Sequence, residues 1–191
     1  MASLADLERA VATAREAGCR DLVLLKCTST YPATPQNTNI KTIPHLRELF
    51  GVQVGLSDHT MGLGVAVGAV ALGATVVEKH FTLRRSDGGV DSAFSLEPEE
   101  LQALVLESER VWQALGEIRY GPSEAEQKSL VFRRSIYAAI DISFGEEFTV
   151  DNLRIVRPGH GAPPYLLEQL LGKTARRDFA AGTALSLDQL L

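Results

Sequence analysis

The chain has 191 residues and a formal net charge of -5 at pH 7, and 45% of its residues are hydrophobic and 23% charged, which is typical of one medium globular domain or two small ones. Its apolar stretches fall short of the roughly 20 residues that a membrane helix needs, no basic face has the density expected of a nucleic-acid-binding surface, and the early charged residues exclude the apolar centre of a secretory signal. With only two cysteines as well, we expect a cytoplasmic protein without membrane or nucleic-acid partners.

Helices and strands are expected to alternate over the first part of the chain. Apolar side chains recur with helical spacing in four segments, residues 4–17, 42–50, 64–73 and 98–115. Short apolar runs that begin at Leu22, Val54 and Val76 are typical of buried strands, and residues 35–37 are expected to form a loop. Such alternation predicts a parallel α/β sheet with right-handed crossovers. Three strands are too few for a sheet covered on both faces, so we expect the last part of a larger domain.

The pattern changes after residue 116. Residues 117–131 are polar and predict a linker, and residues 141–153 then repeat as residues 178–190 at an offset of 37. Each copy is expected to hold a strand, a Gly turn and a one-turn helix capped by Thr149 or Ser186. The repeat predicts a small pseudo-symmetric β-rich domain.

Two histidines end two neighbouring apolar runs. His59 and His80 lie 21 positions apart, and adjacent parallel strands would bring both imidazoles to the edge of the sheet where active sites are built. Two neutral imidazoles can bind a divalent transition metal and leave positions open for water and substrate oxygens. On spacing alone, histidines that only hydrogen-bond to loops are the alternative.

Three further side chains near the histidines are candidates. Ser57 precedes His59 by two residues and would point to the same side of an extended chain, where its hydroxyl could donate to a bound anion. Asp87 and Asp91 flank two glycines after His80, and a carboxylate there could orient the imidazole or act as a general base. The alternative, a residue that merely starts a turn, is stronger for Asp87 than for Asp91.

Four segments carry a resemblance to a known family. Together, and in this order, they resemble the sialic acid synthase family, and their amino-acid sequences most resemble its pseudaminic acid synthase branch. The segments are residues 26–32 (KCTSTYP), 55–60 (GLSDHT), 78–82 (EKHFT) and 157–161 (RPGHG). The resemblance spans essentially the whole chain. It implies the C-terminal part of a (β/α)8 TIM barrel over residues 1–116, a linker over residues 117–131, and a small SAF (antifreeze-like, β-clip) domain over residues 132–191.

The family condenses phosphoenolpyruvate with an N-acetylated amino sugar, which releases phosphate and gives a nine-carbon 2-keto sugar acid. The resemblance implies that His59 and His80 are ligands of Mn²⁺ or Mg²⁺, and that His80 and Asp91 are catalytic. The positions that match substrate contacts are Ser57, Tyr31, Ser29 and Arg157. In the family the SAF domain of one subunit covers the barrel of its partner, so the resemblance implies a homodimer in which Arg157 acts across the interface.

The first half of the family barrel has no counterpart in this sequence. The resemblance therefore implies either a fragment or a chain that another chain completes, and a free half barrel would leave an exposed strand edge. Several functions stay open on the sequence: N-acetylneuraminate synthase, a catalytically inactive fragment, a SAF module that binds sugar acids, and a metal-dependent aldolase, which fits the histidines but not the repeat.

Overall fold

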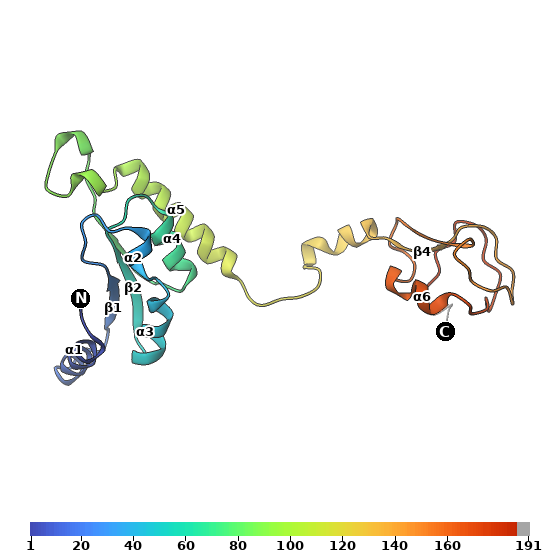
Figure 1. Cartoon of the computed structure of the whole chain (residues 1–191), viewed down its shortest axis with the longest axis horizontal. Coiled ribbons are helices and arrows are strands. Elements are labelled where there is room, and N and C mark those ends of the chain that lie inside the picture. The colour runs from blue at the N-terminus through green and yellow to red at the C-terminus, as the bar shows by residue number, and fades with distance from the viewer. Residues whose placement is uncertain (187–191) are drawn as a thin grey trace. The chain divides into compact units, whose positions relative to one another are not determined.

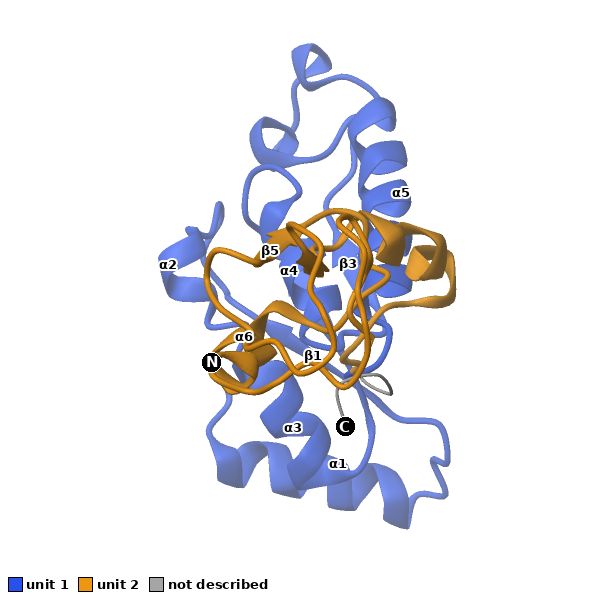
Figure 2. Ribbon diagram, turned by 90° about the vertical axis from the view of Figure 1, so that its right-hand side faces the viewer, with its two compact units in different colours: residues 1–118 blue, residues 119–191 orange. Residues whose placement is uncertain are grey.

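The structure, a computed structural model, describes residues 1–186. It divides into two compact units, Met1–Ile118 and Arg119–Leu191, which are blue and orange in Figure 2. Each unit has its own hydrophobic core. Within the described residues, the longest and most apolar helices still cannot span a bilayer.

Unit 1 is built on a parallel sheet whose strands run in the order β1-β2-β3. The strands are β1 (Val23–Cys27), β2 (Gln53–Asp58) and β3 (Val77–Lys79). The helices between and around them are α1 (Leu4–Glu16), α2 (Pro35–Thr38), α3 (Thr42–Phe50), α4 (Gly64–Ala71) and α5 (Pro98–Leu115). The expected parallel sheet and the four long helices are thus observed.

The helix ends follow from local sequence. At the start of α1, the Ser3 hydroxyl and the Asp6 carboxylate form a capping box, in which Asp6 Oδ2 accepts from Ser3 N at 3.0 Å. Gly51 ends α3 in a left-handed conformation that costs glycine little. Pro98 stands at the first position of α5, where its missing N–H leaves no hydrogen bond unmade.

The prediction of a loop at residues 35–37 is wrong, because these residues form the helical turn α2. Pro35 occupies the first position of the turn. The Asn37 side chain accepts from Thr34 N at 3.1 Å, and the Thr38 hydroxyl donates to Thr34 O at 2.9 Å. Residues that favour loops also cap helices, and here the caps are satisfied within one turn.

The core of unit 1 lies between the sheet and the helices on one side of it (Figure 1). Helices α3 and α4 pack on β2, and α5 packs on α4. Val54 and Leu56 of β2 are fully buried. The outer edge of β1 is different: no strand among residues 1–186 pairs with it, and Val23 is 42% exposed.

Unit 2 is small and rich in extended chain. Its regular strands, β4 (Ser135–Ala138) and β5 (Leu153–Val156), pair antiparallel, and an isolated bridge joins Ile142 to Phe179. The short helical segments of the unit are η3 (Glu124–Phe132), η4 (Pro164–Leu166) and α6 (Leu167–Leu170).

The predicted repeat appears in unit 2 as a reciprocal pair of hydrogen bonds. Asp141 Oδ1 accepts from Ala181 N, Asp178 Oδ1 accepts from Phe144 N, and both distances are 2.7 Å. These four positions are related by the offset of 37 residues. The second copy runs on into residues 187–190, which lie outside the described residues.

Two details of this part of the chain differ from expectation. The one-turn helix predicted after Thr149 is a turn, although the capping bonds are present: Thr149 N donates to Asn152 Oδ1 at 2.7 Å and Asn152 N donates to Thr149 Oγ1 at 3.3 Å. Residues 117–131, predicted as a linker, contain most of the 3₁₀ helix η3, which Ser123 and Glu126 cap. The helix predicted at Ser186 lies outside the described residues.

Candidate active site

The ends of β2 and β3 lie in register and bring their terminal side chains together. Ser57 is opposite Glu78 and Asp58 is opposite Lys79. One residue further, the imidazole rings of His59 and His80 lie 5.1 Å apart, centroid to centroid, at an interplanar angle of 62°. The juxtaposition of the two histidines, expected from their spacing, is therefore observed.

His59 is buried and held in one orientation. Its Nδ1 lies 3.1 Å from the carbonyl oxygen of Thr28. A carbonyl can only accept, so Nδ1 carries the proton and donates, which leaves the lone pair of Nε2 available to a metal. The Cys27 thiol lies 4.0 Å from the same Nδ1, on the side of the ring that the hydrogen bond already uses.

Lys26 holds the end of β1, where the carbonyl group of Thr28 contacts His59. Lys26 Nζ donates to Cys27 O at 2.9 Å and to Thr28 Oγ1 at 3.2 Å. Desolvation on burial lowers the pKa of Lys26 from its ordinary value. The lysine thus fixes the turn whose carbonyl orients His59.

His80 is accompanied by Asp91. His80 Nδ1 lies 3.6 Å from Asp91 Oδ2, which is ion-pair distance but longer than a hydrogen bond. Asp91 directly precedes the short helix η2 (Ser92–Phe94). The structure thus places this carboxylate where it can orient the imidazole, as one of the two expected roles requires. Asp87 is exposed at the end of η1 (Arg85–Asp87), consistent with the turn alternative.

Arg85 forms hydrogen bonds that hold the loop carrying Asp91. Arg85 Nε donates to Ser95 O at 3.0 Å, Arg85 N donates to Glu97 Oε1 at 2.8 Å, and the guanidinium also bonds Glu100. The backbone N–H of Glu97, and then Arg85, hold the pKa of Glu100 below its usual range. The network joins both ends of the loop to the start of α5.

Two aromatic rings border the histidines. The Tyr31 ring lies 4.3 Å from the His59 ring and 5.9 Å from the His80 ring, centroid to centroid. The Phe94 ring lies 5.1 Å from His80 and 6.1 Å from Tyr31. Tyr31 was expected near the site; Phe94 was not, because it comes from an irregular loop where sequence periodicity says nothing about direction.

Ser57 and Ser29 are placed less directly at the imidazoles. The Ser57 hydroxyl donates to Glu78 Oε1 at 2.6 Å, so its proton is committed to a carboxylate rather than free for an anion. Ser29 is exposed, and its hydroxyl lies 3.9 Å from the Cys27 thiol. Sequence reasoning missed Glu78, although the 21-residue offset that relates the histidines also relates it to Ser57.

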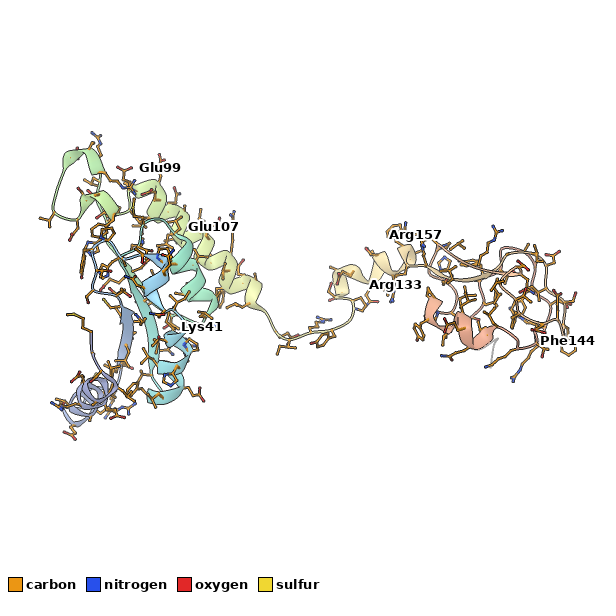
Figure 3. All side chains as sticks on the ribbon, in the orientation of Figure 1. Lys41, Glu99, Glu107, Arg133, Phe144 and Arg157 are labelled. Carbon is orange, nitrogen blue, oxygen red and sulfur yellow. The ribbon has the colours of Figure 1, made fainter. Side chains whose placement is uncertain are left out.

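Arg157 belongs to unit 2 and is exposed there. The following residue is held firmly: Pro158 O accepts from Ser135 Oγ at 2.8 Å and from Tyr137 Oη at 3.0 Å. Arg157 lies at the same end of the unit as Arg133, and Phe144 lies at the opposite end (Figure 3). The residue that follows Arg157 is thus anchored within unit 2.

The comparisons with known proteins agree with the four sequence segments. Residues 1–120 match the NeuB family and residues 133–191 match the SAF domain. Pseudaminic acid synthase from Campylobacter jejuni is 47% identical over 165 residues, which are 86% of this chain and 48% of that protein. An N,N'-diacetyllegionaminic acid synthase from the same species is 38% identical over 182 residues, which are 94% of this chain and 54% of that protein.

A solved structure gives the same result. The N-acetylneuraminic acid (sialic acid) synthetase of Leptospira borgpetersenii, in complex with citrate, superposes with a TM-score of 0.62 at 35% identity, covering 68% of this chain and 45% of that chain. This chain spans about half the length of the curated relatives it matches. From the two domain matches, and from relatives of this similarity, we conclude that the chain belongs to the NeuB family and carries a SAF domain.

Proposed function

We propose that this chain supplies the metal-binding part of a synthase that condenses phosphoenolpyruvate with an N-acetylated amino sugar to give a nine-carbon 2-keto sugar acid. The observation that carries the proposal is the pair of adjacent imidazoles at the ends of β2 and β3, with Nδ1 of His59 turned to the carbonyl oxygen of Thr28. The names of the relatives support the type of reaction.

The donor set fits a divalent metal held by two protein ligands. His59 and His80, whose rings lie 5.1 Å apart, would hold the ion and leave its other positions open. Among residues 1–186, no cluster of three or more His, Cys, Asp or Glu side chains that could hold an ion is found. Imidazole nitrogens suit a transition-metal ion such as Mn²⁺ better than Mg²⁺, which prefers oxygen. When bound, the metal would polarise the aldehyde of the acceptor sugar.

The surrounding side chains have separable tasks in this proposal. Asp91 Oδ2 lies 3.6 Å from His80 Nδ1 and would orient the imidazole through charge; proton exchange between them requires that they close to hydrogen-bond distance. Tyr31 and Phe94 border the histidines with aromatic rings, against which a substrate could pack. Glu78 holds the Ser57 hydroxyl; the anion contact proposed for Ser57 requires that this bond be exchanged for one to the substrate.

We also infer that unit 1 is part of a barrel. Its strands are parallel, α3 and α4 pack on β2 with α5 outside α4, and the outer edge of β1 has unpaired backbone groups where a further parallel strand fits. In a completed barrel the histidines would lie at the C-terminal ends of the strands, the face that carries barrel active sites. The contact of Arg157 with substrate across a homodimer, with the SAF domain exchanged, belongs to the same proposal.

Among acceptors, the precursor of pseudaminic acid is the first candidate, because the pseudaminic acid synthase named above is 47% identical and the legionaminic acid synthase is 38% identical. The precursors of legionaminic acid and N-acetylneuraminate are the alternatives. To decide, the chain is co-expressed with the N-terminal part of the C. jejuni relative, and phosphate release from phosphoenolpyruvate is measured with each precursor and Mn²⁺.

The control for that experiment lies in the same unit. His80→Ala should abolish phosphate release, whereas His45→Ala, at an exposed position on α3, should leave it unchanged. The proposal fails if no precursor yields phosphate, or if His80→Ala is as active as the unaltered chain. Consumption of pyruvate in place of phosphoenolpyruvate would instead indicate an aldolase.

A second function, a SAF module that binds a sugar acid, is favoured by one observation. Unit 2 has its own buried core, and its exposed Arg157 stands beside a loop fixed by Ser135 and Tyr137. Calorimetry of the whole chain with pseudaminic acid, before and after Arg157→Ala, tests it. No heat of binding to the unaltered chain would exclude this function.

A further inference from the structure

A buried ion pair joins the ends of β2 and β3, one residue before each histidine. Lys79 Nζ lies 2.8 Å from Asp58 Oδ2, and the two side chains are 3% and 0% exposed. His59 follows Asp58 in the chain and His80 follows Lys79. The pair therefore connects the two backbone segments that carry the imidazoles.

The same two side chains also hold the backbone beyond His59. Asp58 Oδ1 accepts from Thr60 N at 2.9 Å, and Lys79 Nζ donates to Thr60 O at 2.5 Å. His59 thus stands between two residues that the pair has fixed, and its own carbonyl accepts from Ala33 N at 2.9 Å. The backbone that carries the His59 ring is therefore restrained by hydrogen bonds at His59 and at the residue after it.

Other contacts orient each ring singly. The Thr28 carbonyl acts on His59, and Asp91 acts on His80. The ion pair links the two strands, as the Ser57–Glu78 hydrogen bond does one position earlier, and β3 is only three residues long. It differs from that bond because its two residues directly precede the two histidines. A buried ion pair is weak evidence for stability, since apolar residues of similar volume often serve as well or better, but it can specify one arrangement.

We propose that Asp58 and Lys79 are positioning residues that set the separation of the His59 and His80 rings, so that one metal ion can reach both. This inference rests on the metal site of the proposed function. It predicts that removal of the pair displaces the rings from one another even where unit 1 stays folded, and that metal affinity falls as a consequence.

The test uses a double variant of the 191-residue chain, Asp58→Asn with Lys79→Met. Asparagine keeps an oxygen for Thr60 N, methionine fills the space of the lysine stem, and no uncompensated charge is left behind. In the unaltered chain the rings are close enough for a nuclear Overhauser effect between their protons in histidine-labelled protein. We expect the double variant to lose it, and Mn²⁺ affinity, measured by electron paramagnetic resonance, to fall about 10-fold.

The matched control applies the same chemical changes to an exposed pair on α5. Arg110 Nη1 lies 2.5 Å from Glu107 Oε1, and Glu107→Gln with Arg110→Met should leave both the Overhauser effect and the affinity unchanged. Asp58→Asn alone serves as a second variant: it leaves Lys79 without its partner and should be less stable than the double variant, with the same loss of the Overhauser effect and of Mn²⁺ affinity. Amide signals of α5 report whether unit 1 is folded.

The inference is overturned if the double variant retains the Overhauser effect between the rings. It is also overturned if both variants lose the α5 signals, because the pair would then be a folding requirement rather than a positioning device. An unaltered chain that shows the Overhauser effect but binds no Mn²⁺ would instead remove the metal from the proposed function and leave the placement of the rings intact.

Discussion

The imidazole rings of His59 and His80 lie 5.1 Å apart at the ends of two adjacent parallel strands. If both bind one ion, His59→Ala and His80→Ala should each lower Mn²⁺ affinity by more than about 10-fold, the lower end of what loss of a residue that supports a ligand costs. Titration of the chain with Mn²⁺, followed by electron paramagnetic resonance of the free ion, measures this. His45→Ala is the control, and equal affinity in all three variants would contradict the site.

Removal of only one charge from the buried pair should destabilise the chain more than removal of both. Lys79→Met leaves Asp58 charged and unpaired in the interior, which costs about 3–5 kcal/mol of the free energy of unfolding. Asp58→Asn with Lys79→Met should cost less, because no buried charge remains. Urea unfolding measures both.

The control for this stability series is Glu107→Gln. The Arg110 and Glu107 side chains are 69% and 46% exposed, and Glu107 is labelled on α5 in Figure 3. Exposed pairs of this kind contribute at most about 1 kcal/mol. A loss from Glu107→Gln as large as that from Lys79→Met would show that burial does not govern the effect.

Gly55 should not tolerate a side chain. A Cβ at this position in β2 would collide with the carbonyl oxygen of Val76 and would stand 2.7 Å from Leu25 Cδ2, so Gly55→Ala should destabilise unit 1 by about 1–3 kcal/mol. Gly64→Ala is the matched change at the start of α4, where a Cβ meets nothing within 4 Å. That variant should be neutral or more stable by up to about 1 kcal/mol. Thermal unfolding distinguishes them, and equal effects would refute the close contact.

The hydrogen bonds of Glu100 with Glu97 N and Arg85 predict that stability depends on pH. The pKa of Glu100 is lowered in the folded chain by the Glu97 N–H and by Arg85, so the carboxylate stabilises the fold fully above its unfolded pKa and loses this contribution as pH falls through its folded pKa. Because the side chain is 38% exposed, solvent screening keeps the effect small. Glu100→Gln should therefore lose less stability on acidification than the unaltered chain does, whereas Glu99→Gln should not differ from it. Urea unfolding at a series of pH values tests this.

The sequence predicted most of unit 1 because its signals are local. Apolar spacing located the four long helices within a few residues, and alternation was enough to predict parallel strands. The turn at Pro35 was missed because the residues that favour a loop are the same ones that cap a helix.

The site was predicted less completely, for two physical reasons. Glu78 and Lys79 could have been found, because the register that pairs the histidines also pairs each of them with the residue 21 positions earlier. Phe94 could not have been found in this way, because it lies in a loop held by Arg85. The bond from Arg85 to Ser95 O joins residues ten positions apart in the chain. Periodicity carries information about regular elements and none about such loops.

The reciprocal bonds of unit 2 have a consequence for how that unit holds together. Asp141 accepts a backbone N–H from the second repeat, and Asp178 accepts one from the first. Each repeat closes its own turn with a backbone bond, from Glu146 N to Ser143 O and from Thr183 N to Ala180 O, both at 3.0 Å. Each also sends one backbone N–H to the aspartate of the other copy, so loss of either aspartate removes a bond that ties the two copies together.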